Sequence, residues 1–229
     1  MRINRLFGIV GLLAAMAVGA AAQDDKKDDK KDEPKAKAAR PPLVPATFRA
    51  FLVTDERYPP KVNPPVKLED RDPRDRTGKI HCLVCENGPN PVVAIFVRAD
   101  PSPKLDKPTL TDLTQKLSTL ITTYRADKLA GFVAFLRLDG EYPDDEERDV
   151  KAKDVREFAI SAKSPNVPFG LAPTKSAANE AWGIGEKDEY TVVFYRNMRQ
   201  IKRWKFDENG PTMDQIKEIT DAVEAELNK

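Results

Sequence analysis

The sequence has few of the residues that build common metal and nucleotide sites. Among its 229 residues are only two cysteines and one histidine, too few for most four-ligand zinc sites or for a cysteine-rich scaffold. It has neither a glycine-rich phosphate loop nor a serine nucleophile elbow. Its 38 basic and 37 acidic residues leave no basic excess of the kind that nucleic-acid-binding proteins carry. We therefore expect no nucleic-acid partner, no metal and no cofactor.

The first 22 residues have the three parts of an export signal. Arg2 and Arg5 form a positive end, residues 6–18 are apolar, and small residues at 20–22 precede Gln23. The apolar run is shorter than the roughly 20 residues that span a bilayer, and no stop-transfer segment follows it. The sequence predicts a signal peptide over 1–22, export to the periplasm or the extracellular space, and no stable membrane insertion of the mature protein.

A charged segment follows the leader. Residues 23–40 read QDDKKDDKKDEPKAKAAR and contain no large apolar side chain, so they cannot offset the entropy of ordering. We expect a disordered charged and Pro-rich tether over 23–45 and one domain over 46–229, with its core at about 78–229. Prolines keep the chain extended up to Arg76, and between them Phe48 to Val53 is apolar enough to lie along a sheet edge.

From about Gly78 onward, strand and helix patterns alternate. Residues 91–97 (PVVAIFV) are a continuous apolar run typical of a parallel strand buried on both faces, and residues 130–138 (AGFVAFLRL) are the next strand. Between them, apolar residues recur at helical spacing after Thr109, which can cap the helix. A strand, helix, strand unit of this length predicts a right-handed parallel crossover.

The remaining pattern predicts two helices and a strand, then a hairpin and a closing helix. The expected elements are a helix over 154–162 with Val155, Phe158 and Ala159 inward, a strand over 166–171, a helix over 176–182, antiparallel strands over 190–195 and 200–206, and a helix from the Thr212/Gln215 capping box that buries Met213, Ile216, Ile219, Val223 and Leu227. The acidic residues of 144–149 lack the glycine spacing of a calcium loop and predict a solvated turn. Trp182 and Trp204 are predicted to pack in or beside the core.

This order of elements resembles the thioredoxin-like superfamily, whose core is a strand-helix-strand half followed by a hairpin and a closing helix. Residues 167–204 resemble the second half of peroxiredoxin-like and membrane-tethered reductase-like members, where a small-residue helix ends in a Tyr-Gly or Trp-Gly step, here Trp182-Gly183. Residues 82–98 (CLVCENGPNPVVAIFVR) are similar to exported bacterial thioredoxin-like proteins. The resemblance implies an α/β fold, a three-layer α/β/α sandwich with a mixed central sheet and a C-terminal β-hairpin plus helix.

Two departures from the active members of that superfamily affect function. The loop that carries their reactive cysteines corresponds to Arg98 to Pro108 (RADPSPKLDKP), which has none, so peroxidase chemistry of the peroxiredoxin kind is excluded. Tyr190 stands where those members have a cis-proline. The loop at Arg98 to Pro108 could bind a small ligand or a peptide, and its sequence does not specify which.

Cys82 and Cys85 are nevertheless spaced as a redox pair. In an extended segment the two sulfurs would point to opposite faces, whereas a turn at residues 86–89 would let them meet. Four interpretations stay open: a passive disulfide or buried thiols, an active dithiol/disulfide, a metal site with His81, and an intermolecular disulfide. Covalent haem is excluded because Glu86 stands where the attachment motif needs histidine.

The candidate site therefore comprises Cys82 and Cys85 as the redox pair and His81 as a stabiliser of a thiolate. One hypothesis is an exported thiol-disulfide redox protein that acts on a protein thiol or disulfide. The alternative is a redox-inactive thioredoxin-like binding or scaffold module, in which the two cysteines are structural.

Overall fold

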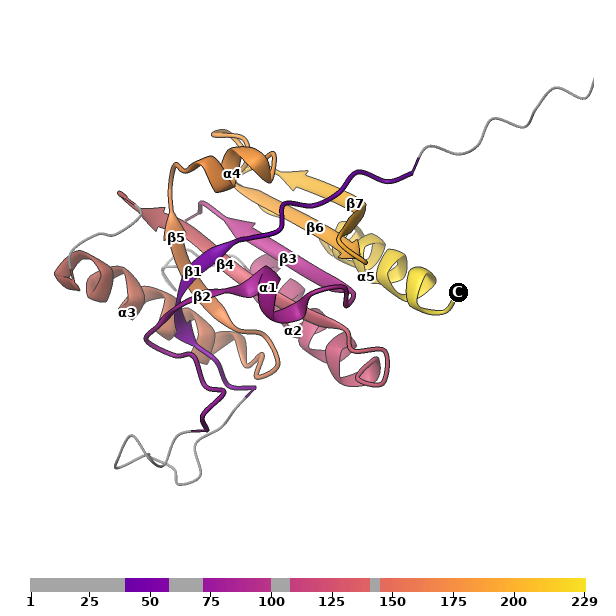
Figure 1. Cartoon of the computed structure of the whole chain (residues 1–229), viewed down its shortest axis with the longest axis horizontal. Coiled ribbons are helices and arrows are strands. Elements are labelled where there is room, and N and C mark those ends of the chain that lie inside the picture. Colours follow the sequence, from indigo (N-terminus) through magenta and orange to yellow (C-terminus); the bar gives the residue numbers. More distant parts are fainter. Residues whose placement is uncertain (1–39, 58–71, 100–107, 141–144) are drawn as a thin grey trace, which may run out of the picture. The chain divides into compact units, whose positions relative to one another are not determined.

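The computed structural model of the chain describes residues 40–57, 72–99, 108–140 and 145–229 (Figure 1). The predicted signal peptide and residues 23–39 of the predicted tether lie outside these ranges. The elements in chain order are β1 (Arg49–Thr54), β2 (Ile80–Cys82), α1 (Leu83–Asn87), β3 (Val92–Val97), α2 (Pro108–Thr123), β4 (Ala130–Leu138), α3 (Asp145–Ala162), β5 (Phe169–Pro173), α4 (Ala177–Ala181), β6 (Tyr190–Arg196), β7 (Arg199–Phe206) and α5 (Met213–Leu227). Within the described ranges, no helix has the length and apolarity needed to cross a membrane.

The strands form one mixed sheet in the order β2-β1-β5-β4-β3-β6-β7. β3 pairs in parallel with β4 and β4 with β5, while the other pairs are antiparallel. All six residues of β3 are buried, as its continuous apolar run predicts. The predicted β3-α2-β4 crossover is confirmed. The predicted hairpin of β6 and β7 is also confirmed, and its two turn residues, Asn197 and Met198, both have the positive φ that a tight hairpin turn favours.

Three long helices cover one face of this sheet. Successive side chains of a strand point to opposite faces, so the residues of β3 and β4 divide between two apolar clusters. Ile95 and Phe135 belong to the cluster that contains the buried sides of α2, α3 and α5. Within α3, the predicted inward residues Val155, Phe158 and Ala159 are buried. This face of the sheet therefore has a full helical layer.

The opposite face is covered by shorter segments. Phe96 and Phe132 lie in a second cluster with residues of α1, α4 and the chain before β1. The rings of Phe48 and Phe96 are 4.9 Å apart between centroids, and those of Phe96 and Trp182 are 5.3 Å apart. Trp182 is fully buried, which confirms its predicted packing role. The fold is thus a three-layer sandwich with one thick and one thin outer layer, and the thin layer comprises residues 44–48, α1 and α4.

The chain before β1 reaches across to the hairpin. Leu43 forms an isolated antiparallel bridge with Arg199, and the Val44 N–H donates to the Met198 carbonyl at 2.9 Å. Val44 is buried. The described end of the predicted tether, residues 40–45, therefore contacts the domain, although the tether itself stays a prediction.

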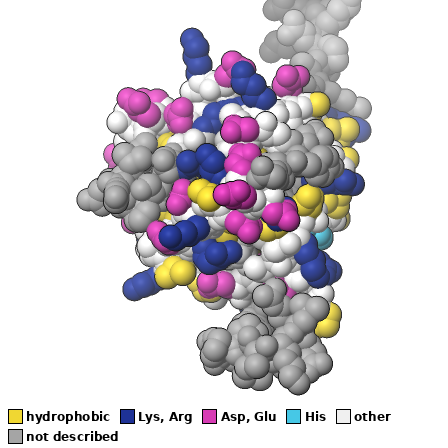
Figure 2. Space-filling view, turned by 90° about the vertical axis from the view of Figure 1, so that its left-hand side faces the viewer, with side chains coloured by type: hydrophobic (Ala, Val, Ile, Leu, Met, Phe, Trp, Pro, Cys, Tyr) yellow, Lys and Arg dark blue, Asp and Glu magenta, His cyan; other side chains and the backbone are white. Residues whose placement is uncertain are grey.

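The acidic run that predicts a turn instead begins a helix. α3 starts at Asp145, nine residues before the predicted start, and Asp144 lies outside the described residues. Asp145, Glu146 and Glu147 occupy the first helical turn, where the partial positive charge of a helix N-terminus favours carboxylates. Figure 2 views the side on which α3 lies in Figure 1 and shows acidic and basic side chains interspersed there.

The predicted edge position of β1 is also wrong. β1 lies between β2 and β5, because the three-residue β2 covers the edge that the sequence left exposed. A strand of three residues is too short to show a period-two pattern, so its sequence does not predict a strand.

Three smaller boundaries differ from the sequence pattern. β5 begins at Phe169 rather than Asn166, since the Val167 N–H still closes a turn onto the Ser164 carbonyl. α2 begins at Pro108, which places Thr109 inside the first turn instead of at the cap. The Thr212/Gln215 capping box is confirmed, but Met213, the first residue of α5, is 54% exposed.

Candidate functional site

The two cysteines form a disulfide at the junction of β2 and α1. Cys82 is the last residue of β2 and the N-cap of α1, and Cys85 lies in the single turn of that helix. Their Cα atoms are 5.3 Å apart because the chain turns directly after Cys82. Gly88, with a φ of +53°, ends the turn in a conformation that favours glycine. The turn that lets the two sulfurs pair is predicted at residues 86–89. In the structure it begins three residues earlier, at Leu83.

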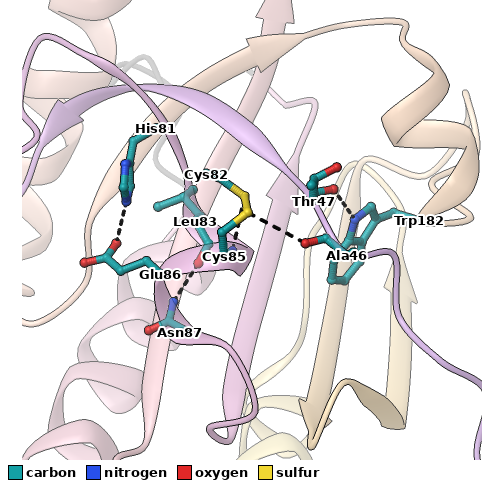
Figure 3. Close-up of a disulfide and its surroundings, with 9 residues drawn as sticks. All are labelled: Ala46, Thr47, His81, Cys82, Leu83, Cys85, Glu86, Asn87 and Trp182. Atoms are coloured by element: carbon teal, nitrogen blue, oxygen red, sulfur yellow. Dashed lines mark hydrogen bonds and ion pairs between the residues drawn. A yellow bond between two sulfur atoms is a disulfide. The ribbon is translucent and has the colours of Figure 1, made fainter.

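The two sulfurs differ in their surroundings (Figure 3). Cys85 is exposed, whereas Cys82 is half-buried and packs against the aromatic cluster of the thin layer. The Cys85 N–H donates to Cys82 Sγ at 3.1 Å. On the other side, Cys85 Sγ lies 3.8 Å from the Ala46 carbonyl oxygen. An approaching thiol thus reaches Cys85 first, and Cys82 Sγ has a backbone donor to stabilise negative charge.

The turn that carries the disulfide is anchored from beneath. Leu83 and Val84 are fully buried, and the Leu83 N–H donates to the Phe48 carbonyl at 3.0 Å. The Asn87 side-chain amide returns to the Leu83 carbonyl at 2.8 Å. These contacts fix α1 on the sheet, although a helix of five residues is not stable by itself.

A line of charged groups runs from this turn to the end of β1. Glu86 Oε2 lies 3.2 Å from His81 Nε2 and 3.2 Å from Arg57 Nη2. Arg57 also donates two hydrogen bonds to Asp55, whose side chain is fully buried, at 2.7 and 2.8 Å. Burial disfavours the charged form of Arg57, but the hydrogen bonds and charges of Asp55 and Glu86 outweigh it and raise the pKa of Arg57. The carboxylates therefore hold a permanently charged guanidinium beside α1.

His81, the predicted thiolate stabiliser, faces this charged line. Figure 3 shows its imidazole pointing toward Glu86 and away from the disulfide. Sequence reasoning missed Asp55, Arg57 and Glu86, since Arg57 and Glu86 are 29 residues apart and no local motif joins them. No group of three His, Cys, Asp or Glu side chains in the described ranges is arranged to hold a metal ion.

Arg98 closes the end of β3, at the place where the resemblance puts reactive cysteines. Its guanidinium donates to the carbonyls of Thr174, at 2.6 Å, and Gly185, at 3.2 Å. Tyr190 begins β6 opposite Val97, the last residue of β3. Residues 100–107 of the predicted loop lie outside the described ranges. The disulfide therefore lies away from this end of the sheet. The elements that carry the two cysteines are β2 and α1.

The comparisons with known proteins bear on the fold. No protein-family model and no curated protein matches the chain. Among solved structures, an uncharacterized conserved protein from Geobacillus kaustophilus is similar at 14% identity, over 84% of each chain, with a TM-score of 0.51. A proposed thiol:disulfide interchange protein DsbE from Chlorobium tepidum is similar at 12% identity, over 82% of this chain and 98% of that one, with a TM-score of 0.51.

A third solved structure extends this likeness. A proposed protein disulfide isomerase from Bacteroides thetaiotaomicron is similar at 13% identity, over 83% of this chain and 91% of that one, with a TM-score of 0.51. At these identities the likeness supports a conclusion about the fold alone. The chain therefore has the thioredoxin-like fold, as its order of elements predicts.

Proposed function

We propose that this protein is an exported thiol-disulfide exchange protein, and that the Cys82–Cys85 disulfide is its reactive group. The observation that carries the proposal is the asymmetry of the pair, with Cys85 exposed and Cys82 half-buried next to a backbone donor. Two of the similar solved structures are described as thiol:disulfide interchange or disulfide isomerase proteins, which supports the same class of chemistry.

The reaction proceeds by two exchanges. A partner thiolate attacks Cys85 Sγ, and a new bond joins the partner sulfur to Cys85 Sγ. The Cys82–Cys85 bond breaks, and its electron pair stays on Cys82 Sγ. The Cys85 N–H stabilises this leaving thiolate. A second thiol of the partner then attacks the partner's own sulfur in the mixed disulfide and releases Cys85. The partner leaves with a disulfide, and Cys82 and Cys85 keep its two electrons and two protons as a dithiol.

The short spacing of the pair also favours a reactive role. The cysteines are three residues apart, so the bond constrains the unfolded chain by only about 2 kcal/mol, against about 4.7 kcal/mol for a loop of about 100 residues. A disulfide selected for stability gains more from a longer loop.

The cellular setting follows from the leader. The predicted signal peptide, residues 1–22, would deliver the protein to the periplasm or the extracellular space, where disulfides persist. Its partners would then be exported proteins that carry a pair of thiols. Protein substrates suit the exposed position of Cys85 at the surface of the thin layer.

We include His81 in the proposal as a stabiliser of the Cys82 thiolate. Because its ring faces Glu86, the imidazole would reach the Cys82 sulfur only after turning away from that carboxylate. His81→Gln removes the imidazole, which should destabilise the reduced form and make the reduction potential more negative by less than about 30 mV. A shift to a less negative potential would exclude this role.

The alternative function is a redox-inactive binding module. It is favoured by Arg98, whose hydrogen bonds occupy the end of β3 where active relatives carry cysteines, and by the burial of Leu83 and Val84 beneath the disulfide. In that case the cysteines fasten α1 to the sheet and do not exchange.

The reduction potential of the pair distinguishes the two functions. It is measured by alkylation of the thiols across glutathione or dithiothreitol buffers of defined ratio. We expect a value of roughly −270 to −180 mV, the range from thioredoxin to protein disulfide isomerase. A value below about −300 mV assigns the pair a structural role.

The asymmetry of the pair is tested with single variants. In Cys82→Ser the remaining Cys85 thiol is exposed and should form a mixed disulfide with oxidised glutathione faster than Cys82 does in Cys85→Ser. Neither variant should complete a cycle of disulfide exchange with a dithiol peptide. Full activity of Cys82→Ser would exclude the proposed reaction.

A further inference from the structure

A cavity of about 250 Å³ lies where β1, β2, β5 and α4 meet. Its walls are mainly apolar and include Phe51, Ile80, Leu171 and Ala178. Ile80 is two residues before Cys82 in β2, and Thr47, which also lines the cavity, follows the Ala46 whose carbonyl contacts Cys85 Sγ. The cavity and the disulfide are therefore neighbours on the same strands.

The size of the cavity indicates what it can accept. Small-molecule and cofactor clefts are usually about 300–1,000 Å³, so this one is small for such a ligand. Its volume suits one large apolar side chain. Ile80 is 50% exposed at the rim and extends the apolar surface toward solvent.

The edge of β2 offers hydrogen bonds to an extended chain. The Leu83 N–H and the Lys79 carbonyl both form hydrogen bonds with the segment that contains β1. In an antiparallel pair only alternate residues form such bonds, so the backbone N–H and C=O of Ile80 point away from β1. Within the described ranges β2 is the last strand on its side of the sheet. A partner segment can therefore add to this edge as a further strand.

Arg148 is a cationic group of the cavity wall, and neighbouring side chains already engage it. Its guanidinium lies 4.6 Å from the centroid of the Phe51 ring, and its Nε lies 3.9 Å from Asp149 Oδ1. The Arg148 guanidinium is already paired with Asp145 at 2.6 Å, which weakens its attraction for an anion.

We propose that this cavity binds an apolar side chain of the partner polypeptide, whose backbone pairs with the outer edge of β2 beside the disulfide. The inference rests on the proposed function, since it names the substrate class of the same site: an extended polypeptide with a large apolar residue near its cysteine. Binding at this site holds the partner thiol close to the exposed Cys85 sulfur.

The test uses short fluorescein-labelled peptides in which serine replaces cysteine, so that binding is measured without exchange. One peptide carries leucine two residues from that serine, and the matched peptide carries serine in place of the leucine. By fluorescence anisotropy the purified protein should bind the leucine peptide about tenfold more tightly, as burial of one leucine side chain predicts.

Two variants and one control locate the site. Ile80→Ser at the rim and Ala178→Leu inside the cavity should both remove the preference for leucine. Ile201→Ser, which changes an exposed isoleucine on the opposite edge strand β7, should keep it. Circular dichroism and a cooperative unfolding transition establish that each variant is folded.

The outcomes separate the inference from the proposed function. Equal binding of both peptides, or a preference that survives Ile80→Ser and Ala178→Leu, overturns the inference. So does saturable binding of octanoate without binding of either peptide, which would assign the cavity to a small aliphatic ligand. The peptides cannot exchange disulfides, so a potential outside the reactive range overturns the proposed function and leaves the binding result intact.

Discussion

The two faces of the sheet are built in different ways. The helices α2, α3 and α5 on one face have 16, 18 and 15 residues, whereas α1 and α4 on the other have five residues each. The disulfide lies in the layer of short elements, and the cavity reaches into that layer through the residues of α4 that line it. The thick layer supplies most of the helical residues, and the thin layer carries the chemistry that we propose.

This difference fits what each layer has to do. Helices of five residues do not form alone, so the thin layer depends on its aromatic contacts and on the chain before β1. Segments with few supporting contacts open at a lower free energy than the core, and reactive sites are commonly drawn from them. Opening of α1 would widen the approach of a partner sulfur to the exposed Cys85 in line with the bond.

The largest effect on stability is expected when one buried aromatic ring is removed from each face of the sheet. Phe48 is 1% exposed and contacts the rings of Phe96 and Trp182 in the thin layer. Phe135 is fully buried under the long helices. Phe48→Ala and Phe135→Ala should each lower the free energy of unfolding by about 3–5 kcal/mol, measured by urea denaturation.

The two variants should differ in the reactivity of the disulfide. The Phe48 ring packs with Phe96 and Trp182 in the cluster that also contains Leu83 of α1, so its truncation should loosen α1 and speed reduction by dithiothreitol under native conditions. Phe135→Ala should leave that rate near the wild-type value. Equal acceleration in both variants would show that the layers are not independent.

A second test breaks the charged line that joins α1 to β1. Arg57→Leu leaves the fully buried Asp55 carboxylate without its two hydrogen bonds, which should cost about 3 kcal/mol of stability. Lys217→Gln in α5 removes an exposed ion pair with Asp221 and should leave stability near the wild-type value, because solvent screens such a pair. Similar losses in both variants would mean that Arg57 does not anchor the thin layer.

Removal of the disulfide should have a smaller and more local effect. The Cys82→Ser/Cys85→Ser double variant should lose about 2 kcal/mol, the value for a cross-link across so short a loop. Hydrogen exchange should accelerate at the Gly88 amide, which bonds to the Val84 carbonyl at the end of α1. The Ile216 amide in α5 serves as the reference and should keep its protection relative to global unfolding.

The thick layer and the central strands could be predicted from sequence, and the reason is local. β3 and β4 are single uninterrupted apolar runs, and α5 has both a capping box and a regular apolar spacing. Each signal lies within one element, so one sequence suffices to find it. The start of α3 was missed because its acidic first turn resembles a loop, although carboxylates are favourable there.

The thin layer shows the limit of the same reasoning. The spacing of Cys82 and Cys85 identified the pair, but the turn that joins them depends on the contact of Leu83 with Phe48. The pairing of β2 with β1 and the ion pair of Arg57 with Glu86 join segments that are far apart in sequence. Such contacts follow from the folded topology, and no periodicity along the chain encodes them.

The smallest expected effect concerns the loop between α4 and β6, on the thin side. Burial opposes ionisation of Asp188, but hydrogen bonds from Lys205 and from the Gly185 N–H, each at 2.7 Å, outweigh it and hold the pKa of Asp188 below its usual value. A carboxyl with a lowered folded-state pKa stabilises the fold above its unfolded pKa, and this contribution disappears as the pH falls through the folded pKa. Acid should therefore loosen this loop.

The corresponding measurement is the free energy of unfolding as a function of pH, from neutral down to below about pH 4. Asp188→Asn should be less stable than the wild type at neutral pH, and its stability should fall less steeply in acid, because it has lost the carboxylate that becomes protonated. Asp127→Asn, an exposed change in the turn after α2, should follow the wild-type curve. If Asp188→Asn also follows that curve, the contacts of Asp188 with Lys205 and Gly185 do not stabilise this loop.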